Sequence, residues 1–378
     1  MDLYIDRNEL IQGLSRVQGI VERRSTNMAL SHVLLSADGE CLRMTATDTM
    51  LSLVGEYVAR IETEGELTVD AQGFFQIAKS LPAQTVHLQS VAGNRLAIKS
   101  GSAEFHMVGL SAEDYPPLPG RDESMNLQIP GSNLKKLIEE TIFAVSADDN
   151  RYGLNGAHWE EITSSNGEAR IRVVTTDGSR LAYSEASYDG DFGMGRRMLL
   201  PRKALAEIRK LCETVAGRSE NDAIWEIGFG ERSATFSTTG LTLMVRLIDG
   251  DFPDYRQVLP NGLKRKVTVD QKALIDALRR VAIVASDRNH SVRFVFEPDA
   301  LVLTAQNVDM GDAREEIPIE LDGEPMYTGF NVRYFQDILS AVKSEKLEIH
   351  MGESLDPCVV KLPDRDDCLF VVMPMRLD

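Results

Sequence analysis

The sequence predicts an α+β fold of three repeated domains, each with two helices packed on antiparallel β-sheets. One apolar pattern recurs near residues 3, 127 and 267, and a second recurs near residues 69, 200 and 330. Each begins with strand-like residues and continues at the i, i+4, i+7 spacing of an amphipathic helix. Stretches rich in β-branched residues follow the helical part. We therefore expect two helices and roughly eight strands in each third of the chain.

Both patterns repeat at nearly constant intervals. The first has seven columns, with copies offset by 124 and then 140 residues, and only Thr141 interrupts its apolar character. The second is offset by 131 and then 130 residues. The six strand-and-helix segments that we expect are residues 3–21, 69–81, 127–145, 200–212, 267–285 and 330–342.

Strands are expected where alternating or β-branched residues are bounded by Gly, Asp or Asn. Such stretches occur in all three thirds of the chain. They are residues 32–36, 42–47, 51–58, 169–176, 181–187, 292–297 and 301–306.

Proline and glycine cluster at two places that separate the repeats, residues 114–120 and 251–262. Prolines cannot continue a strand ladder, so linkers or strand edges are expected there. The resulting prediction is three domains, residues 1–122, 123–256 and 257–378.

Composition narrows the class of protein. The 41 basic and 58 acidic residues give a net charge of −17, which argues against a broad basic face. No apolar run approaches the ~18 residues of a membrane helix, and the N-terminal residues do not resemble a secretion signal. The four cysteines are scattered without a CxxC motif. Free thiols of this kind favour a cytoplasmic protein.

No sequence motif indicates a reaction centre. The six histidines have no metal-ligand spacing, and no nucleophile elbow, phosphate-binding loop or complete dinucleotide fingerprint occurs. The acidic pairs Asp148-Asp149 and Glu315-Glu316 are typical of solvated loops or strand edges. We expect no enzyme activity, no cofactor and no metal.

The polar faces of the predicted helices carry cations. One interpretation is a solvated face of mixed charge; the other is that all six helices face a polyanion such as duplex DNA. The residues alone leave both open. These cations are Arg16, Lys79, Lys135, Lys136, Arg202, Lys203, Lys210, Lys272, Arg279, Arg280, Arg333 and Lys343.

Over its whole length the chain resembles the bacterial sliding clamp family, the β subunit of DNA polymerase III. Five segments, in order on a three-fold repeat, carry the resemblance. They are Arg151 to Gly156, Thr175 to Ala182, Asp251 to Tyr255, Phe330 to Val332, and Val371 to Leu377.

The resemblance implies a head-to-tail homodimer, a six-domain ring around duplex DNA with helices lining the hole. The ring would tether a polymerase by topology and raise its effective concentration at the primer end. A clamp loader, rather than the clamp, would use ATP. The implied partners are the polymerase III catalytic subunit, the loader, other polymerases and repair proteins, all bound through short linear motifs.

The family's hydrophobic partner pocket can be transferred motif by motif. Methionines give it an adaptable apolar surface. The alternative for residues 371–375 is a buried terminal strand, and both can hold because alternate strand residues face opposite sides. The implied pocket residues are Leu154, Thr176, Gly178, Arg180, Leu181, Pro253, Val258, Val372, Met373, Pro374 and Met375.

For DNA, the resemblance points to Arg24, Lys136, Tyr152, Arg202, Lys203 and Arg279. The sequence departs from the family at Gln72-Gly73, where relatives often carry a basic pair, and at the acidic Asp148-Asp149. For the dimer interface, it suggests Phe105 and Met107 of the first domain against Ile283 and Val284 of the third, where apolar residues suit an interface.

The sequence departs from the family pattern at two further positions, and two alternatives to a sliding clamp remain open. Ser179 replaces a larger residue common in relatives, and Asp378 extends the usual terminal leucine. One rival is a scaffold of the same fold that never encloses DNA, and the other is an unrecognised repeat enzyme, which would need a convergent polar cluster in a cleft. Retention on circular but not linear DNA separates a clamp from a scaffold.

Overall fold

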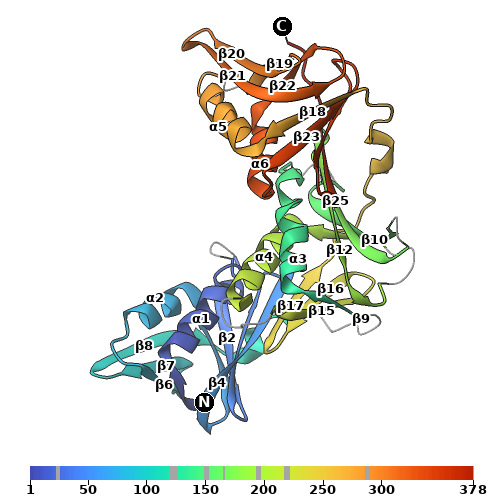
Figure 1. The fold of residues 1–378 in the computed structure, drawn as a ribbon. Coiled ribbons are helices and arrows are strands. Elements are labelled where there is room, and N and C mark those ends of the chain that lie inside the picture. The colour runs from blue at the N-terminus through green and yellow to red at the C-terminus, as the bar shows by residue number, and fades with distance from the viewer. Residues whose placement is uncertain are drawn as a thin grey trace. The chain divides into compact units, whose positions relative to one another are not determined.

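The computed structural model describes residues 1–22, 26–118, 126–148, 153–164, 167–192, 197–216, 222–285 and 290–377. The chain, drawn as a ribbon in Figure 1, divides into two compact units. The first unit holds Met1–Ser132, Asp189–Phe192 and Glu207–Leu247. The second holds Asn133–Tyr188, Gly193–Ala206 and Ile248–Asp378.

Six α-helices lie in the described part of the chain, one in each predicted segment. They are α1 (Arg7–Val17), α2 (Ala71–Ser80), α3 (Gly131–Glu139), α4 (Arg202–Ala216), α5 (Gln271–Ala282) and α6 (Val332–Ala341). Each apolar column becomes the face that packs on a sheet, as the period of 3.6 requires. The predicted helices are therefore confirmed.

Four helices begin at a side-chain cap on the last residue of the preceding strand. The carboxylates of Asp6, Asp70 and Asp270 accept backbone N–H groups in the first turns of α1, α2 and α5. The Asn331 side chain does the same for α6. These caps satisfy otherwise unpaired donors, so strand and helix adjoin without a loop.

The first unit is built on a 13-stranded antiparallel sheet, in the order β1-β6-β7-β8-β5-β2-β3-β4-β17-β16-β15-β9-β13. Its strands are β1 (Asp2–Asp6), β2 (His32–Asp38), β3 (Cys41–Thr47), β4 (Leu51–Thr63), β5 (Gly65–Asp70), β6 (Thr85–Val91), β7 (Arg95–Ser100), β8 (Ala103–Leu110), β9 (Asn126–Pro130), β13 (Asp189–Gly190), β15 (Ile224–Phe229), β16 (Ser233–Thr238) and β17 (Leu241–Arg246).

The second unit is built on a 12-stranded antiparallel sheet, in the order β14-β10-β11-β12-β25-β24-β23-β18-β21-β20-β19-β22. Its strands are β10 (Gly156–Thr163), β11 (Ala169–Thr176), β12 (Arg180–Ser187), β14 (Arg197–Pro201), β18 (Arg265–Asp270), β19 (Ser291–Phe296), β20 (Ala300–Asn307), β21 (Gly311–Asp322), β22 (Met326–Asn331), β23 (Lys346–Met351), β24 (Cys358–Leu362) and β25 (Arg365–Val372).

Each unit contains one strand pair that joins consecutive sequence repeats. The first joining pair is β4–β17, in which Ser52 lies opposite Met244. The second is β12–β25, in which Leu181 lies opposite Val371. Continuous sheets across these joins hold neighbouring repeats together by backbone hydrogen bonds.

Three polar residues of the predicted helical segments are buried, namely Arg16, Glu140 and Thr141. Thr141 donates to the backbone oxygen of Leu137 at 2.6 Å, and its own carbonyl accepts from the Thr175 hydroxyl at 2.7 Å. Arg16, expected on a polar helix face, is instead buried and donates to the phenol oxygen of Tyr57 at 3.3 Å. Arg16 is therefore not one of the solvent-facing cations, because its guanidinium group lies inside the first unit.

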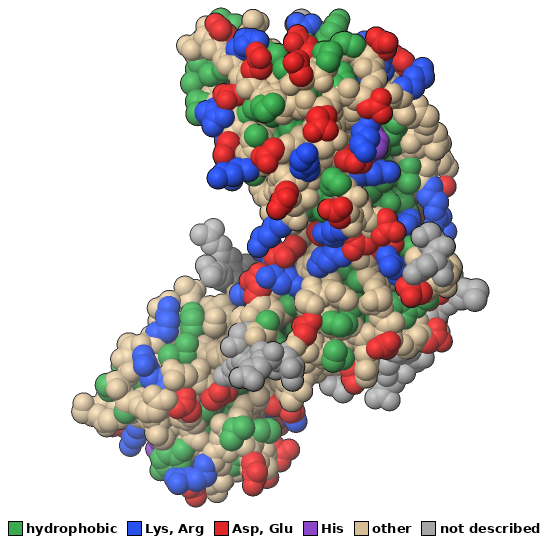
Figure 2. Space-filling view, in the orientation of Figure 1, with side chains coloured by type: hydrophobic (Ala, Val, Ile, Leu, Met, Phe, Trp, Pro, Cys, Tyr) green, Lys and Arg blue, Asp and Glu red, His purple; other side chains and the backbone are tan. Residues whose placement is uncertain are grey.

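None of the described helices combines the length and apolar character that a membrane crossing requires. On the face drawn in Figure 2, acidic and basic side chains are interspersed over the described surface.

Candidate functional site

A small apolar pocket lies in the second unit, beside the second joining pair. Its volume is about 180 Å³. Four segments form it: the turn that precedes β10, the β11–β12 turn, the linker that follows residue 252, and the end of β25 with the residue after it. The lining residues are Leu154, Thr176, Gly178, Arg180, Leu181, Pro253, Asp254, Tyr255, Val258, Val371 and Met373.

The β11–β12 turn is held open by its own side chains. Asp177 accepts the backbone N–H groups of Ser179 and Arg180, at 2.9 and 3.1 Å. The Thr176 hydroxyl accepts from the Gly178 N–H and donates to the Arg180 carbonyl. Gly178 has a φ of 87°, a left-handed conformation that favours glycine. The turn thus forms one rigid rim of the pocket.

The floor of the pocket comes from one face of the second joining pair. Val371 and Leu181 pack with Val174, Tyr255 and Val359 in a small buried cluster. The neighbouring Val372 points to the opposite face and belongs to the large core around α5 and α6. The assignment of Val372 to the pocket is therefore wrong, because adjacent strand residues face opposite sides, and Val371 takes its place.

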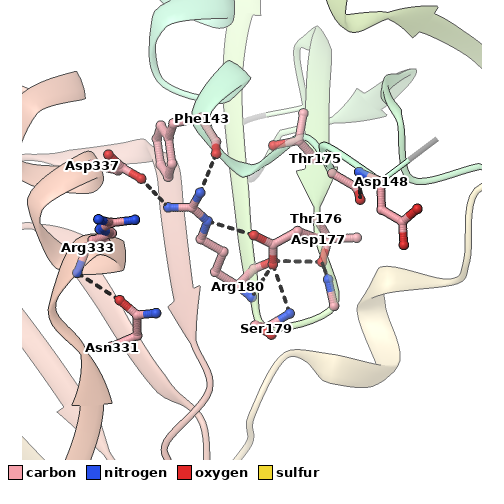
Figure 3. Close-up of polar contacts among 12 residues, drawn as sticks. Phe143, Asp148, Thr175, Thr176, Asp177, Ser179, Arg180, Asn331, Arg333 and Asp337 are labelled. Atoms are coloured by element: carbon pink, nitrogen blue, oxygen red, sulfur yellow. Dashed lines mark hydrogen bonds and ion pairs between the residues drawn. The ribbon is translucent and has the colours of Figure 1, made fainter. Parts of the chain in front are cut away.

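Arg180 lines the pocket, but its guanidinium group is already engaged (Figure 3). It donates to the Asp177 carboxylate at 2.9 Å, to Asp337 of α6 at 2.5 Å and to the carbonyl of Phe143 at 2.6 Å. The aromatic rings of Phe143 and Tyr334 lie against it as well. Arg180 therefore joins the pocket rim to α6 and offers a ligand mainly its aliphatic part.

The linker wall of the pocket, residues 252–258, is fastened by Tyr255. The Tyr255 ring is buried in the floor cluster, and its hydroxyl donates to the Glu160 carboxylate at 2.6 Å. The same oxygen accepts from Arg172 at 2.8 Å. Arg172 also donates to the buried Glu185 at 2.9 Å through Nε. Residues of β10, β11 and β12 thus converge on one linker side chain.

Two further contacts hold the same wall. Arg256 donates to Glu160 at 3.0 Å, and the His158 ring stacks on Phe252 with centroids 5.0 Å apart. Burial alone would raise the pKa of Glu160. Hydrogen bonds from His158 and Tyr255, together with the charge of Arg256, outweigh burial and hold that pKa at about 2. Glu160 is therefore an anion at neutral pH, and the linker is tied to a fixed charge.

The C-terminal segment completes the rim and is anchored at two points. The Met373 N–H donates to the Ser179 carbonyl at 2.9 Å, and the Met375 N–H donates to the Gly329 carbonyl of β22 at 2.7 Å. A Cβ on Gly329 would lie 2.5 Å from the Leu377 side chain, so only glycine permits this approach. Met373 remains 38% exposed at the mouth of the pocket.

Eight of the eleven predicted pocket residues line one cavity. Pro374 and Met375 lie beyond its lining, along β22. Sequence reasoning missed Asp254, Tyr255 and Val371. The segment Asp251 to Tyr255, one of the five that carry the family resemblance, contains Asp254 and Tyr255 and so pointed to this linker. Adjacent strand residues face opposite sides of a sheet, so placing Val372 in the core would have pointed to Val371 as the pocket residue.

The predicted DNA contacts occupy different environments. Lys136 forms an ion pair with Asp367. Arg202 and Lys203 are exposed at the start of α4, and Arg279 is exposed on α5, 3.8 Å from Asp276. Arg24 and Tyr152 lie outside the described residues.

The predicted dimer contacts occupy two surfaces. Phe105 and Met107 are half-buried on β8, whereas Ile283, just after α5, is 67% exposed and Val284 is half-buried. Among the described residues, no cluster of His, Cys, Asp or Glu has the arrangement of a metal site.

The sequence matches three domain families in succession. They are the N-terminal domain of the DNA polymerase III beta subunit over residues 1–119, its central domain over 128–254 and its C-terminal domain over 256–376. The chain belongs to the DNA polymerase III beta subunit family of sliding clamps. Members of this family form ring-shaped dimers.

Relatives and solved structures agree with this membership. The beta sliding clamp of Caulobacter vibrioides is 33% identical and that of Pseudomonas aeruginosa 34%, with 100% of each chain covered. The sliding clamp of Bartonella birtlesii bound to griselimycin superposes with a TM-score of 0.93 at 31% identity, again with 100% of both chains covered. The clamp described here is thus a DNA sliding clamp, a non-catalytic processivity factor of DNA polymerase III.

Proposed function

We propose that the pocket beside the second joining pair is the partner-binding site of this clamp. Short linear motifs of the polymerase III catalytic subunit, the clamp loader, other polymerases and repair proteins would insert apolar side chains there. The supporting observation is an open cavity whose floor and rim are apolar and whose polar groups are largely paired with one another. A preformed site of this kind binds peptides without first reorganising.

A peptide titration tests this assignment. The double substitution Met373→Ala with Met375→Ala should weaken binding of a fluorescent clamp-binding peptide by roughly tenfold, because truncating anchor contacts has effects of this order. The melting temperature should not change, since Met373 is partly exposed at the pocket mouth. Met28→Ala, at a methionine that is 63% exposed in the first unit, is the matched control. Unchanged peptide affinity in the double variant would refute the assignment.

For DNA, we propose sequence-independent contacts from Arg24, Lys136, Tyr152, Arg202, Lys203 and Arg279. Scattered cations suit a sliding protein, because each phosphate contact adds affinity and a densely basic lining would grip the duplex. Lys136 shares its charge with Asp367 and should contribute least of the lysines and arginines. Retention on nicked circular DNA and loss from linear DNA would support encirclement. Equal retention on both would favour the scaffold.

We further propose a dimer seam, defined as the contact of Phe105 and Met107 of one copy with Ile283 and Val284 of another. Half-buried Phe105 and Met107 on one surface, and exposed Ile283 beside half-buried Val284 on the other, support it. Light scattering at low micromolar concentration should give 83.8 kDa, twice the chain mass of 41.9 kDa. A mass of 41.9 kDa would contradict the seam.

We also propose a cytoplasmic location and three domains, with the limits 1–122, 123–256 and 257–378. The clustered prolines at both boundaries support the domain limits. Three buried cysteines and one half-buried cysteine, none of them in a disulfide, are compatible with a reducing compartment.

A further inference from the structure

Four charged side chains of the second unit form an ion-pair network that joins α3 to the start of β25. Lys136 of α3 donates to the Asp367 carboxylate. Arg365 donates to the other oxygen of Asp367 at 2.8 Å and to the two oxygens of Glu140 at 2.7 and 3.0 Å. Cations and anions thus alternate from the surface of α3 to the buried Glu140.

The buried end of the ion-pair network holds the two strands that form the pocket floor. Glu140 also accepts from the Ser184 hydroxyl of β12 at 2.6 Å. Ser184 lies directly opposite Cys368 of β25. One carboxylate therefore restrains β12 through Ser184 and β25 through Arg365. Because a bidentate bond between arginine and a carboxylate is strong and directional, Glu140 stabilises the second joining pair.

The segment that begins at Glu140 also contacts β11 and β12 at the pocket rim. The Thr141 carbonyl accepts from the Thr175 hydroxyl at 2.7 Å. The Phe143 carbonyl accepts from the Arg180 guanidinium group at 2.6 Å (Figure 3). A displacement of this short segment would therefore reach both the floor and the rim of the pocket.

The other end of the ion-pair network is accessible to solvent. The side chain of Lys136 is 30% exposed and that of Asp367 is 21% exposed. Burial alone would raise the pKa of Asp367, but hydrogen bonds from Arg365 and Lys136 outweigh it and lower that pKa. A lysine ammonium group on a flexible stem can exchange one anion for another. Asp367 therefore competes with a DNA phosphate for Lys136.

We propose that the ion-pair network couples DNA contact at α3 to the peptide affinity of the partner pocket. This inference rests on the proposed partner site and adds its regulation. When a phosphate takes Lys136, Asp367 keeps Arg365 as its cation and draws it away from Glu140. The restraint on the joining pair then weakens, and the pocket binds peptides less tightly. A ring on DNA thus exchanges its partners more readily than a free ring.

Two substitutions should reproduce the two states without DNA. Lys136→Met leaves Asp367 to compete for Arg365, and should weaken binding of a fluorescent clamp-binding peptide by roughly fivefold. Asp367→Asn removes the competing anion and should leave peptide affinity unchanged. The two substitutions together should restore wild-type affinity, since Arg365 again serves Glu140 alone. Equal affinities in the two single variants, or a double variant that is not restored, would overturn the proposal.

Adding DNA tests the coupling directly. A saturating short linear duplex at low salt should weaken peptide binding to the wild-type clamp by roughly fivefold. Asp367→Asn should bind the duplex more tightly, because Lys136 no longer pairs with Asp367, and its peptide affinity should not respond to the duplex. A duplex effect that persists in this variant would mean that DNA acts by another route, such as covering the pocket, and the coupling would be wrong.

Lys135→Met is the matched control for the loss of one cation from α3. Lys135 is the residue before Lys136 and forms an ion pair with Glu139 of the same helix at 3.6 Å. This variant should keep wild-type peptide affinity without DNA and should still respond to the duplex. Lys136→Arg, which retains the charge, should behave in the same way. A loss in Lys136→Arg equal to that in Lys136→Met would show that packing, and not charge, carries the effect.

The pocket assignment and the coupling fail in different experiments. If the Met373→Ala, Met375→Ala double variant binds peptide weakly while Lys136→Met and Asp367→Asn behave alike, the pocket stands and the coupling is wrong. If the methionine double variant binds peptide as the wild type does, the pocket assignment itself is wrong.

Discussion

The two joining pairs have the same strand pairing, but the side chains beside them contact the linker differently. Beside the first, Arg43 and Glu56 form an exposed cross-strand ion pair at 3.2 Å, with 42% and 47% of their side chains accessible. Beside the second, the equivalent Arg172 and Glu185 are covered by the linker, and Arg172 also bonds Tyr255. The equivalent arginine–glutamate pair is thus exposed to solvent at the first join, whereas at the second join it holds the linker in place.

The linker tyrosines show the same contrast. Tyr115 donates to the backbone carbonyls of His32 and Thr45, at 3.4 and 3.2 Å. Tyr255 instead meets the side chain of Glu160, whose place in the first repeat is taken by Ser36. The floor of the first join also differs, because the polar Ser52 and the apolar Met244 stand where Leu181 and Val371 do.

The comparison teaches that the fold alone does not make a binding pocket. The hollow over the first join, about 870 Å³, is lined by polar and apolar side chains together, among them Arg43, Glu56, Gln128, Ile224 and Met244. A peptide bound there would have to cover charged and hydroxyl groups as well as apolar ones, whereas the lining of the second pocket is mostly apolar. The pocket arises where an apolar floor coincides with a linker fixed by buried charge.

The largest expected difference between the joins concerns the two arginines. Arg172→Ala leaves Glu185 buried without its main partner and should cost ~3–5 kcal/mol in free energy of unfolding. Arg43→Ala removes an exposed pair and should cost ~0–1 kcal/mol. Urea unfolding, with hydrogen exchange of β11 and β12 to locate the loss, measures both. Equal costs would mean that the linker does not bury the second pair in solution.

The two tyrosines give a smaller contrast. Tyr255→Phe removes a hydroxyl that bridges Glu160 and Arg172, and should cost ~1–3 kcal/mol of stability. It should also weaken peptide binding severalfold by loosening the linker wall. Tyr115→Phe loses a comparable hydrogen bond but should leave peptide affinity unchanged. A similar fall in peptide affinity for both variants would argue against a specific role of the hydrogen bonds that join Tyr255 to Glu160 and Arg172.

The smallest contrast is a pH effect. The pKa of Glu160 falls from 4.5 to about 2 on folding, so its stabilising effect is present above pH 4.5 and is lost as pH falls toward 2. Peptide affinity should therefore depend on Glu160 at pH 5 to 7 and fall between pH 4.5 and 2. A Glu160→Gln variant should lack that part of the pH profile, and Glu161→Gln, one residue along β10, is the control. Identical profiles for wild type and Glu160→Gln would exclude the effect.

Sequence reasoning located the secondary structure well because periodicity is local. All six helices coincide with apolar columns whose spacing alone defines a face. It failed for Val372 because a strand face is decided by one residue of register. It also failed for Arg16, since nothing near that residue in sequence announces the distant Tyr57 that accepts its hydrogen bond.

The cluster at the linker lay beyond sequence reasoning for a similar reason. Glu160, Arg172, Glu185 and Tyr255 come from four separate segments, and each is an ordinary charged or aromatic residue in its own surroundings. Only the pairing of β10, β11 and β12 places them together. The family resemblance identified most of the residues that line the pocket. The contacts that fix the linker wall are apparent only in the three-dimensional structure.

In the described part of the chain, residues 103–108 of β8 pair only with β7 and residues 311–318 of β21 pair only with β20, so each strand has an open edge. Unpaired strand edges are templates for unwanted strand addition, and charged residues and proline commonly guard them. Glu104 and His106 stand on one edge, and Asp312, Arg314, Glu316 and Pro318 on the other. These charged residues and the proline disfavour strand addition by unrelated chains, so the edges do not act as templates for fibres.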